Sequence, residues 1–461
     1  MSALSWHLNS PLVSQMLGLA ISGMIPVHLR SEGTFSRMIA ETPGLMEAVR
    51  SRFAHVESCP FEGPRIFFEN AGGALRLKTV IDSSAAHAGY PDNQGRDNPA
   101  SQALMATITR GKDDMALFLN APGGQCFVGE SGTEVLFRLI RTAALGAQAG
   151  GQMIGSTLEH PASASAMARW AEVTDRPLVR VAHDDASGTV TADAYRAALT
   201  PETRVATIVH TSPVTGMSVD VEAVAAAIRQ IAPACFIIVD GIQHASHGAV
   251  DVAAIGADGY ALSPYKMFSR HGYGVGWASD RLTACPKEQI VNGPAANWEM
   301  GTRDSGAYAT FSDVVEYLDW LGATFTDSPD RRTRLEAAGQ AIRAHEEHLM
   351  RAMLQGAGNL PGVVDMPGVQ VIGSAAVEGR EGVVSLRLAG MASADLVAHL
   401  RDNGIRVHIR KNDHYCGNIL GPLGLEDCIR VSVCHYNTED EVRRFLSAMT
   451  QAVAKAQHAV D

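Results

Sequence analysis

The chain has 461 residues, of which 46% are hydrophobic and 19% charged, a composition that excludes an intrinsically disordered protein. The net charge of −11 at pH 7 argues against a surface that binds nucleic acid, although small anionic ligands can still occupy local sites. No apolar run approaches the roughly 20 residues of a membrane span, and residues 1–10 lack the pattern of a signal peptide.

The seven cysteines are odd in number and scattered, and no two of them form a CxxC pair. This spacing argues against a disulfide framework and against a structural zinc site. It favours a reducing compartment, so we expect a cytoplasmic protein. His244 and His247 lack a third ligand at a matching spacing, so no metal site is predicted.

After a strand candidate at residues 65–69, short apolar runs alternate with segments of helical spacing from about residue 115 to residue 280. The predicted helices are Thr133–Ala147 and Val221–Ile231. The predicted strands are Arg65–Glu69, Gln152–Ser156, Arg204–His210, Cys235–Val239 and Gly274–Ala278. Alternation of this kind predicts an α/β domain with a mostly parallel sheet and helices on its faces.

After residue 310 the pattern changes to long helices followed by short strands. The predicted helices are Phe311–Gly322, Arg331–Leu354, Ala394–Asn403 and one that begins at Thr438, and the predicted strands are Val369–Ile372, Gly382–Leu388, Arg406–Ile409 and Ile429–Cys434. We therefore expect three parts. Residues 1–64 form an N-terminal segment that joins the small domain, residues 65–310 the large α/β domain, and residues 311–461 a smaller C-terminal α+β domain.

Asp240 ends a predicted buried strand, and Lys266 follows the next apolar segment. Ligands of α/β sheets bind at the carboxyl ends of strands, although a lone aspartate there is often a helix cap and a lone lysine is usually solvated. Apolar flanks would desolvate Lys266 and lower its pKa, as an amine nucleophile needs. Such a pair can hold pyridoxal phosphate (PLP): the carboxylate keeps the ring nitrogen protonated and the lysine forms a Schiff base.

At these residues the chain resembles the class V aminotransferase and cysteine desulfurase group of PLP-dependent enzymes, which have fold type I. The resemblance covers roughly residues 65–455 and rests on several motifs in the same order. It implies a large domain with a mostly parallel, seven-stranded type of sheet and a smaller C-terminal α+β domain. It also implies a homodimer with shared active sites and an amino acid as the small-molecule substrate.

The resemblance implies a phosphate-binding set for the cofactor. Gly132 and Thr133 open a helix and resemble the family's phosphate-binding turn, where free backbone N–H groups and the helix dipole favour an anion. Ser263 matches a phosphate-binding serine, and Tyr265, which replaces a frequent histidine, can donate through its hydroxyl. Thr302 lies in a segment that resembles a loop reaching the phosphate of the partner subunit; the alternative is a turn within the chain.

A second implied set surrounds the cofactor ring. His160 corresponds to a histidine that stacks on the ring, and Asp240 and Gln243 keep the family's three-residue spacing. Many members have asparagine where this chain has Pro213. The hydrogen bond to the ring hydroxyl is therefore expected from Ser212 or Gln243.

Two residues are implied to bind the substrate. Arg430 lies on a predicted strand and matches an arginine that grips the α-carboxylate, a role that suits its planar fork of donors. Asn70 lies in a turn after the first predicted strand, near the active site of the family. A surface ion pair is the alternative for Arg430.

The reaction itself depends on Cys416, which lies 14 residues before Arg430 on a predicted loop. Either its thiolate accepts sulfur from the substrate, as in a cysteine desulfurase, or it is one of several buried cysteines. With Lys266 and His160 it completes the predicted catalytic set, and a sulfur-acceptor protein would then be a partner. Transamination, epimerisation, another β- or γ-elimination and a non-catalytic scaffold are the alternatives.

Overall fold

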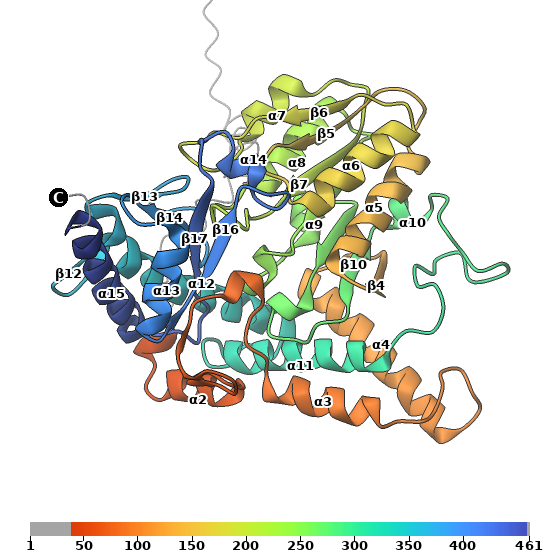
Figure 1. Ribbon diagram of the computed structural model, residues 1–461. Helices are drawn as coiled ribbons and strands as arrows, with labels where there is room; N and C mark the ends of the chain where they lie inside the picture. The colour runs from red at the N-terminus through yellow and green to blue at the C-terminus, as the bar shows by residue number, and fades with distance from the viewer. Residues whose placement is uncertain (1–37, 459–461) are drawn as a thin grey trace, which may run out of the picture. The chain divides into compact units, whose positions relative to one another are not determined.

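The computed structural model describes residues 38–458, so most of the predicted N-terminal segment 1–64 lies outside the described residues. Its largest sheet has seven strands in the order β4-β10-β9-β8-β7-β5-β6 (Figure 1). These strands are β4 (Gln125–Gly129), β5 (Gln152–Ser156), β6 (Leu178–Val181), β7 (Thr203–Val209), β8 (Phe236–Asp240), β9 (Gly259–Leu262) and β10 (Gly274–Ala278). All run parallel except β10, which is antiparallel to both of its neighbours.

Strand β8 shows why these segments are continuous apolar runs. Phe236 and Ile238 point into one apolar cluster, which includes residues of α5 and α6. Ile237 and Val239 point into a second cluster, which includes residues of α8 and α11. Because both faces of the sheet are covered, alternation with polar residues is lost. The predicted fold class, a mostly parallel seven-stranded sheet flanked by helices, is confirmed.

Helices connect and cover the strands of this sheet. Their bounds are α3 (Lys78–Ala88), α4 (Pro99–Leu119), α5 (Gly132–Gly146), α6 (Pro161–Val173), α7 (Ala192–Ala198), α8 (Val221–Ile231), α9 (Val252–Ile255), α10 (Asp280–Thr283) and α11 (Ser305–Gly322). A long loop joins α10 to α11, and Figure 1 shows it extending away from the sheet. Among residues 38–458, no helix combines the length and the hydropathy needed to cross a bilayer.

A second, antiparallel sheet has four strands in the order β13-β14-β17-β16. Its strands are β13 (Val369–Val371), β14 (Val383–Leu388), β16 (His408–Lys411) and β17 (Asp427–Ser432), and its helices are α12 (Arg331–Gln355), α13 (Ser393–Asp402), α14 (Gly417–Leu420) and α15 (Glu439–His458). Ile429 and Val431 of β17 enter an apolar cluster with residues of α12, α13 and α15. Arg430 lies between them and therefore points to the opposite face.

The described N-terminal residues contact the C-terminal part of the chain. They form α2 (Leu45–Arg52) and the short strands β1 (Ser58–Cys59), β2 (Gly63–Pro64) and β3 (Ile66–Phe67), and β3 pairs in parallel with β15 (Ile405–Arg406). Arg50 forms an ion pair of 3.3 Å with Glu441 of α15. The predicted domain boundaries at residues 64 and 310 stay predictions.

Short connecting elements complete the described fold. They are η2 (Ile39–Glu41), η3 (Asn70–Gly72), η4 (His244–Ser246), η5 (Pro264–Lys266), η6 (Val363–Asp365), β11 (Gly356–Ala357) and β12 (Leu360–Pro361). Two of them bear on function, because η4 and η5 directly follow the ends of β8 and β9. The predicted strand Arg65–Glu69 is shorter than expected, since the turn η3 begins at Asn70.

Candidate active site

Four parallel strands of the large sheet end at one edge and bring the predicted motifs together. His160 follows β5, Ser212 follows β7, Asp240 ends β8 and Lys266 follows β9. The backbone carbonyl of Asp240 accepts from His210 N at 2.9 Å, which joins the loop after β7 to the end of β8. Ligands of α/β sheets bind at this edge, so the motifs scattered in sequence form one candidate site.

Asp240 is a buried carboxylate at the centre of that edge. It accepts hydrogen bonds from Ile242 N at 3.1 Å and from Ser163 Oγ at 3.4 Å. Among residues 38–458, no cation lies within ion-pair distance of it. Burial raises the pKa of Asp240, while the positive charge of Lys266 opposes the shift. A buried carboxylate without a contacting cation fits the protonated nitrogen of a pyridinium ring.

Lys266 ends the turn η5 directly after β9. Its Nζ donates to Gln243 Oε1 at 3.2 Å. Burial lowers the pKa of Lys266 to about 7, and the nearby charge of Arg430 adds to this effect, whereas Asp240 opposes it. Near neutral pH, Lys266 is therefore a neutral amine in a large fraction of the molecules. The neutral amine is the form that attacks a carbonyl carbon.

The amino end of α5 lies against the Ser263 turn. The Ser131 hydroxyl caps α5 by accepting from Glu134 N at 3.1 Å, which leaves the other first-turn N–H groups available. A Cβ built on Gly132 would lie 2.3 Å from Ser263 Oγ, so glycine is needed for this close approach. Thr133 is exposed beside it. Free N–H groups and two hydroxyls at a helix amino end fit a phosphate.

The contacts of Tyr265 differ from the predicted phosphate role. Its ring stacks on His271 at a centroid distance of 4.3 Å. A Cβ built on Gly73 would lie 3.3 Å from the Tyr265 ring. None of the described contacts of Tyr265 reaches the amino end of α5. The geometry thus assigns Tyr265 to the turn around Gly73 instead.

His160 and Ser212 both cap a neighbouring turn. His160 is the N-cap of α6, and its Nδ1 accepts from Ala162 N at 3.1 Å. Burial lowers the pKa of His160 to about 4, with further lowering by Lys266 and Arg410, so the ring is neutral and suited to stacking. Ser212 Oγ accepts from Thr215 N at 3.1 Å, which leaves only its proton for a ring hydroxyl.

Arg430 lies buried on the polar face of the C-terminal sheet. Its Nη1 donates to the Pro213 carbonyl oxygen at 2.9 Å, while its Nε has no hydrogen-bond partner among residues 38–458. A Cβ built on Gly72 would lie 3.5 Å from Arg430 Nη2, so the turn at Gly72 packs directly against the guanidinium. Burial lowers the pKa of Arg430 to about 10, which still leaves a cation at neutral pH.

The side chain of Asn70 is hydrogen-bonded to other residues of the protein. Its Nδ2 donates to the Ser432 carbonyl oxygen at 2.7 Å, and its Oδ1 accepts from the Tyr436 hydroxyl. Phe67 O and Asn437 Oδ1 also lie within 3.2 Å of Nδ2. These contacts use the donors of the amide, so they do not support the predicted contact with substrate. Asn70 instead joins the N-terminal turn to the end of β17.

Cys416 is fully buried at the start of α14. Arg410 Nε donates to its sulfur at 2.9 Å. Burial raises the pKa of the Cys416 thiol, although Arg410 opposes the shift. The loop nevertheless lies next to the His160 turn, because Asn418 Nδ2 donates to the Thr157 carbonyl oxygen at 2.8 Å. Cys416 is therefore near the predicted position but is enclosed in this conformation.

Thr302 lies away from the strand ends. It is exposed in the loop between α10 and α11. That loop is anchored by Trp298, which stacks on Phe127, and by Glu299, which accepts from Val128 N at 3.2 Å. Within one chain Thr302 is not part of the site.

Sequence reasoning missed several polar residues that border the site. Ser163 contacts Asp240, Arg410 contacts Cys416, and His247 with Glu346 contacts Gln243. The period of two in β16 and β17 could have identified Arg410, because His408 pairs with Arg430 and Arg410 pairs with Cys428 on the same face. No local signal joins His247 to Glu346, which lies 99 residues later on α12.

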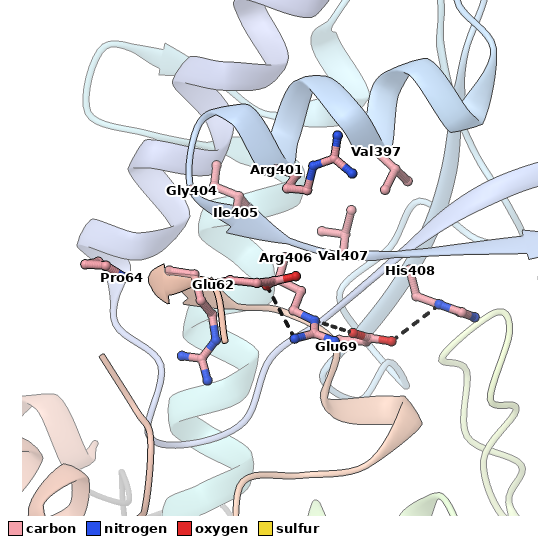
Figure 2. Close-up of a pocket in the computed structure, with 11 residues that line it drawn as sticks. Glu62, Pro64, Glu69, Val397, Arg401, Gly404, Ile405, Arg406, Val407 and His408 are labelled. Atoms are coloured by element: carbon pink, nitrogen blue, oxygen red, sulfur yellow. Dashed lines mark hydrogen bonds and ion pairs between the residues drawn. The ribbon is translucent and has the colours of Figure 1, made fainter. Parts of the chain in front are cut away.

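A pocket of about 530 Å³ adjoins this region on the side of β15 and β16. Figure 2 shows Glu69 between Arg406 and His408, with ion pairs of 2.9 and 3.4 Å. The carboxylate of Glu69 thereby contacts one arginine other than Arg430, and a histidine whose pKa is lowered by burial. This pocket was not predicted, and its lining residues do not include Lys266.

Comparisons with known proteins agree with this geometry. The sequence profile of the family Aminotransferase class-V matches residues 66–327 and 334–445. A probable cysteine desulfurase of Vibrio cholerae is 25% identical over 431 residues, covering 88% of this chain and 98% of that protein. One of Mycolicibacterium paratuberculosis is 26% identical over 426 residues, covering 87% of this chain but 57% of that longer protein.

The fold is also similar to that of solved structures. The apo structure of a cysteine desulfurase from Thermococcus onnurineus has a TM-score of 0.73 at 20% identity, covering 85% of this chain and 95% of that one. At this identity the likeness establishes the fold. The profile match spans well over half of the sequence, and the chain therefore belongs to the class V aminotransferase family, whose members are PLP-dependent enzymes.

Proposed function

We propose that the protein binds PLP and acts on an amino acid, as a cysteine desulfurase-like C–S lyase. The observation that supports this most is the placement of Asp240 and Lys266 at the ends of adjacent parallel strands. One is a buried carboxylate without a contacting cation, and the other an amine whose pKa is about 7. When bound, PLP supplies an electron sink and an aldehyde carbon for the amine.

Different residues of this chain would bind different parts of the cofactor. Gly132, Thr133 and Ser263 fit the phosphate, and Asp240 fits the ring nitrogen. The neutral His160 ring can stack on one face of the cofactor. The lowered pKa of Lys266 allows its nitrogen both to bond the cofactor and to remove a proton from the substrate carbon.

Arg430 would bind the α-carboxylate of the substrate, because two of its nitrogens are free of protein acceptors. In the desulfurase reading Cys416 accepts sulfur, which requires the loop after β16 to open and Arg410 to release the thiol. The Cys416 thiolate would attack the substrate sulfur, so that an S–S bond forms as the substrate C–S bond breaks, and the electron pair of the broken bond stays on the carbon, which is protonated to give alanine.

The test is an absorbance spectrum of the purified protein with PLP, titrated with cysteine, while alanine is assayed and sulfide is measured after a thiol reductant is added to release it from the persulfide. We expect a visible absorbance band, release of both products, and a Cys416→Ala variant that keeps the band but forms no persulfide. A protein that cannot be loaded with PLP would refute the proposal. Full sulfur transfer by Cys416→Ala would refute the role of the thiol.

A second candidate is a different PLP reaction on an amino acid with an acidic side chain. Arg410 favours it, since among residues 38–458 no carboxylate lies within ion-pair distance of this guanidinium, which shares a sheet face with Arg430. The burial of Cys416 also favours this second candidate. Aspartate and cysteine sulfinate should then shift the cofactor spectrum at lower concentration than cysteine does, and Arg410→Gln should abolish that preference.

We further propose a homodimer in which Thr302 completes the phosphate site of the partner subunit. The exposure of Thr302 in a loop anchored at Trp298 supports this arrangement. Mixed dimers of Thr302→Ala and Lys266→Ala subunits should regain activity, because one of the two sites is then intact. A cytoplasmic location and a sulfur-acceptor protein stay proposals that rest on the free cysteines.

A further inference from the structure

Gln243 lies between Lys266 and a buried histidine–glutamate pair. Lys266 Nζ donates to Gln243 Oε1 at 3.2 Å, and Gln243 Nε2 lies 3.3 Å from His247 Nε2. His247 Nδ1 lies 2.6 Å from Glu346 Oε2 on α12. Gln243, His247 and Glu346 are at most 4% exposed. A continuous chain of three hydrogen bonds thus extends from the lysine into the protein interior.

The chemistry of these groups fixes the position of each proton. An ionised carboxylate only accepts, so Nδ1 of His247 must carry the proton that faces Glu346. The neutral ring then has a lone pair on Nε2, which accepts from the amide N–H of Gln243. The amide oxygen of Gln243 is consequently left to face Lys266, where it accepts from the amine.

Charges from several elements act on His247. Burial alone would lower the pKa of His247, but Glu346 raises it above its ordinary value, and Glu381 acts in the same direction. Arg343 on α12 opposes them, and His435 faces His247 from the segment after β17. Burial also raises the pKa of Glu346. The hydrogen bond from Gln243 to Nε2 therefore forms above the pKa of His247, where the ring holds a single proton on Nδ1.

We propose that His247 and Glu346 are positioning residues that hold the Gln243 amide oxygen on Lys266 and so favour the protonated form of the lysine nitrogen. The inference rests on the proposed function in that it takes Lys266 as the reacting amine. If either residue is lost, the amide can turn its N–H2 group toward the lysine. A donor would then face a donor, and the protonated nitrogen would lose its acceptor.

The chain contains a matched control for this pair. His244 lies in the same turn, is equally buried, and places its Nδ1 2.5 Å from Glu381 Oε1. Its ring stacks on His210 at a centroid distance of 3.5 Å. None of the described contacts of His244 reaches Gln243 or Lys266. Replacing His244 therefore removes a buried histidine–glutamate pair while every side chain of the lysine chain stays in place.

The experiment measures the protonation of Lys266 directly in the cofactor-free protein. Cyanate, a small reagent that reacts with neutral amines, is applied across a pH series, and carbamoylation of the Lys266 peptide is quantified by mass spectrometry. Wild type, Glu346→Gln, His247→Phe and the control His244→Phe are compared. We expect the midpoint to fall by about one pH unit in Glu346→Gln and His247→Phe, since a hydrogen bond to a charged group is weakened.

The control should titrate like wild type. Equal midpoints in all four proteins would overturn the inference, and so would a shift of the same size in His244→Phe. Glu346→Gln keeps the shape of the side chain, so it remains informative if His247→Phe does not fold. Loading each protein with PLP gives a separate readout: failure of wild type to bind PLP refutes the proposed function, whereas the cyanate midpoints still decide this inference.

Discussion

The two sides of the candidate site are built differently. On the cofactor side, at the strand ends, the polar groups Asp240, Gln243 and Lys266 are held by hydrogen bonds of 3.1–3.3 Å within and between neighbouring turns. On the substrate side, the face of the C-terminal sheet, Arg410 and Arg430 contact only a thiol, an aromatic ring and a backbone carbonyl among residues 38–458. On the first side the polar groups are hydrogen-bonded within one chain. On the second side the two guanidinium groups can still bind an anionic ligand.

This difference indicates which side determines the reaction. The contacts on the cofactor side join turns at the ends of neighbouring strands, so its polar groups are hydrogen-bonded to one another within the chain. The substrate side presents cations whose carboxylate partner must come from the ligand. Variants on the cofactor side should therefore lose the cofactor spectrum, and variants on the substrate side should keep it and lose substrate.

The largest loss of turnover is expected from Lys266→Ala. Loss of the amine removes both the covalent attachment of PLP and the base, so turnover should fall by on the order of 10²–10⁴ or more. Turnover and the visible spectrum are measured together, with the exposed Lys455→Ala as the control. Retention of turnover in Lys266→Ala would break the assignment of this lysine to the cofactor side.

Arg430→Gln should act on the other side. Loss of a charge-assisted hydrogen bond raises KM roughly 10- to 100-fold, because such a bond contributes about 1.5–3 kcal/mol. The cofactor spectrum should not change. Steady-state kinetics and PLP titration test this, with Arg387→Gln on β14 as the control. A lost spectrum together with an unchanged KM would mean that Arg430 belongs to the cofactor side.

The pKa of Lys266 predicts how the cofactor is captured. Only the neutral amine attacks the aldehyde, and the pKa of this lysine is about 7. The rate at which cofactor-free protein captures PLP should therefore level off above pH 7 and fall about tenfold per pH unit below it. Stopped-flow absorbance at several pH values measures it. A rate that keeps rising to pH 10 would show an amine with an ordinary pKa.

The smallest effect, on stability and PLP binding, is expected from Gly132→Ala. The added Cβ would lie 2.3 Å from Ser263 Oγ and 2.6 Å from Ile242 Cδ1, and overpacking of this kind costs about 1–3 kcal/mol. We expect a lower free energy of unfolding and weaker PLP binding with an unchanged KM for substrate. Gly89→Ala, where the nearest atom would lie 3.4 Å away, is the control. Equal stability of both variants would contradict the close contact.

Much of the cofactor side could be predicted from sequence because its signals are local. Strand β10 and helix α8 have the predicted bounds, and β8 differs from the prediction by one residue. Asp240 and Lys266 were found from the apolar runs that precede them. The antiparallel direction of β10 could not be predicted, since an apolar run has the same pattern in either direction.

The substrate side was predicted less well because its contacts join distant segments. Nothing near Asn70 in sequence shows that its amide is used by Ser432 and Tyr436. The burial of Cys416 depends on how a loop packs, which the motif around it does not encode. The same limit applies on the cofactor side, where the pairing of His247 with Glu346 requires α12 to lie beside the end of β8.

The junction between the turn at Asn70 and β17 has a consequence for the order of folding. Asn70 and Ser432 are 362 residues apart in sequence, yet one hydrogen bond joins them beside the turn that borders Arg430. Contacts of such high sequence separation form late, because a long loop must be closed first. During synthesis the strand-end residues can assemble while the turn at Asn70 still waits for β17. A nascent chain would thus acquire its cofactor side before it could hold a substrate, and it would become an enzyme only when nearly all of it had been made.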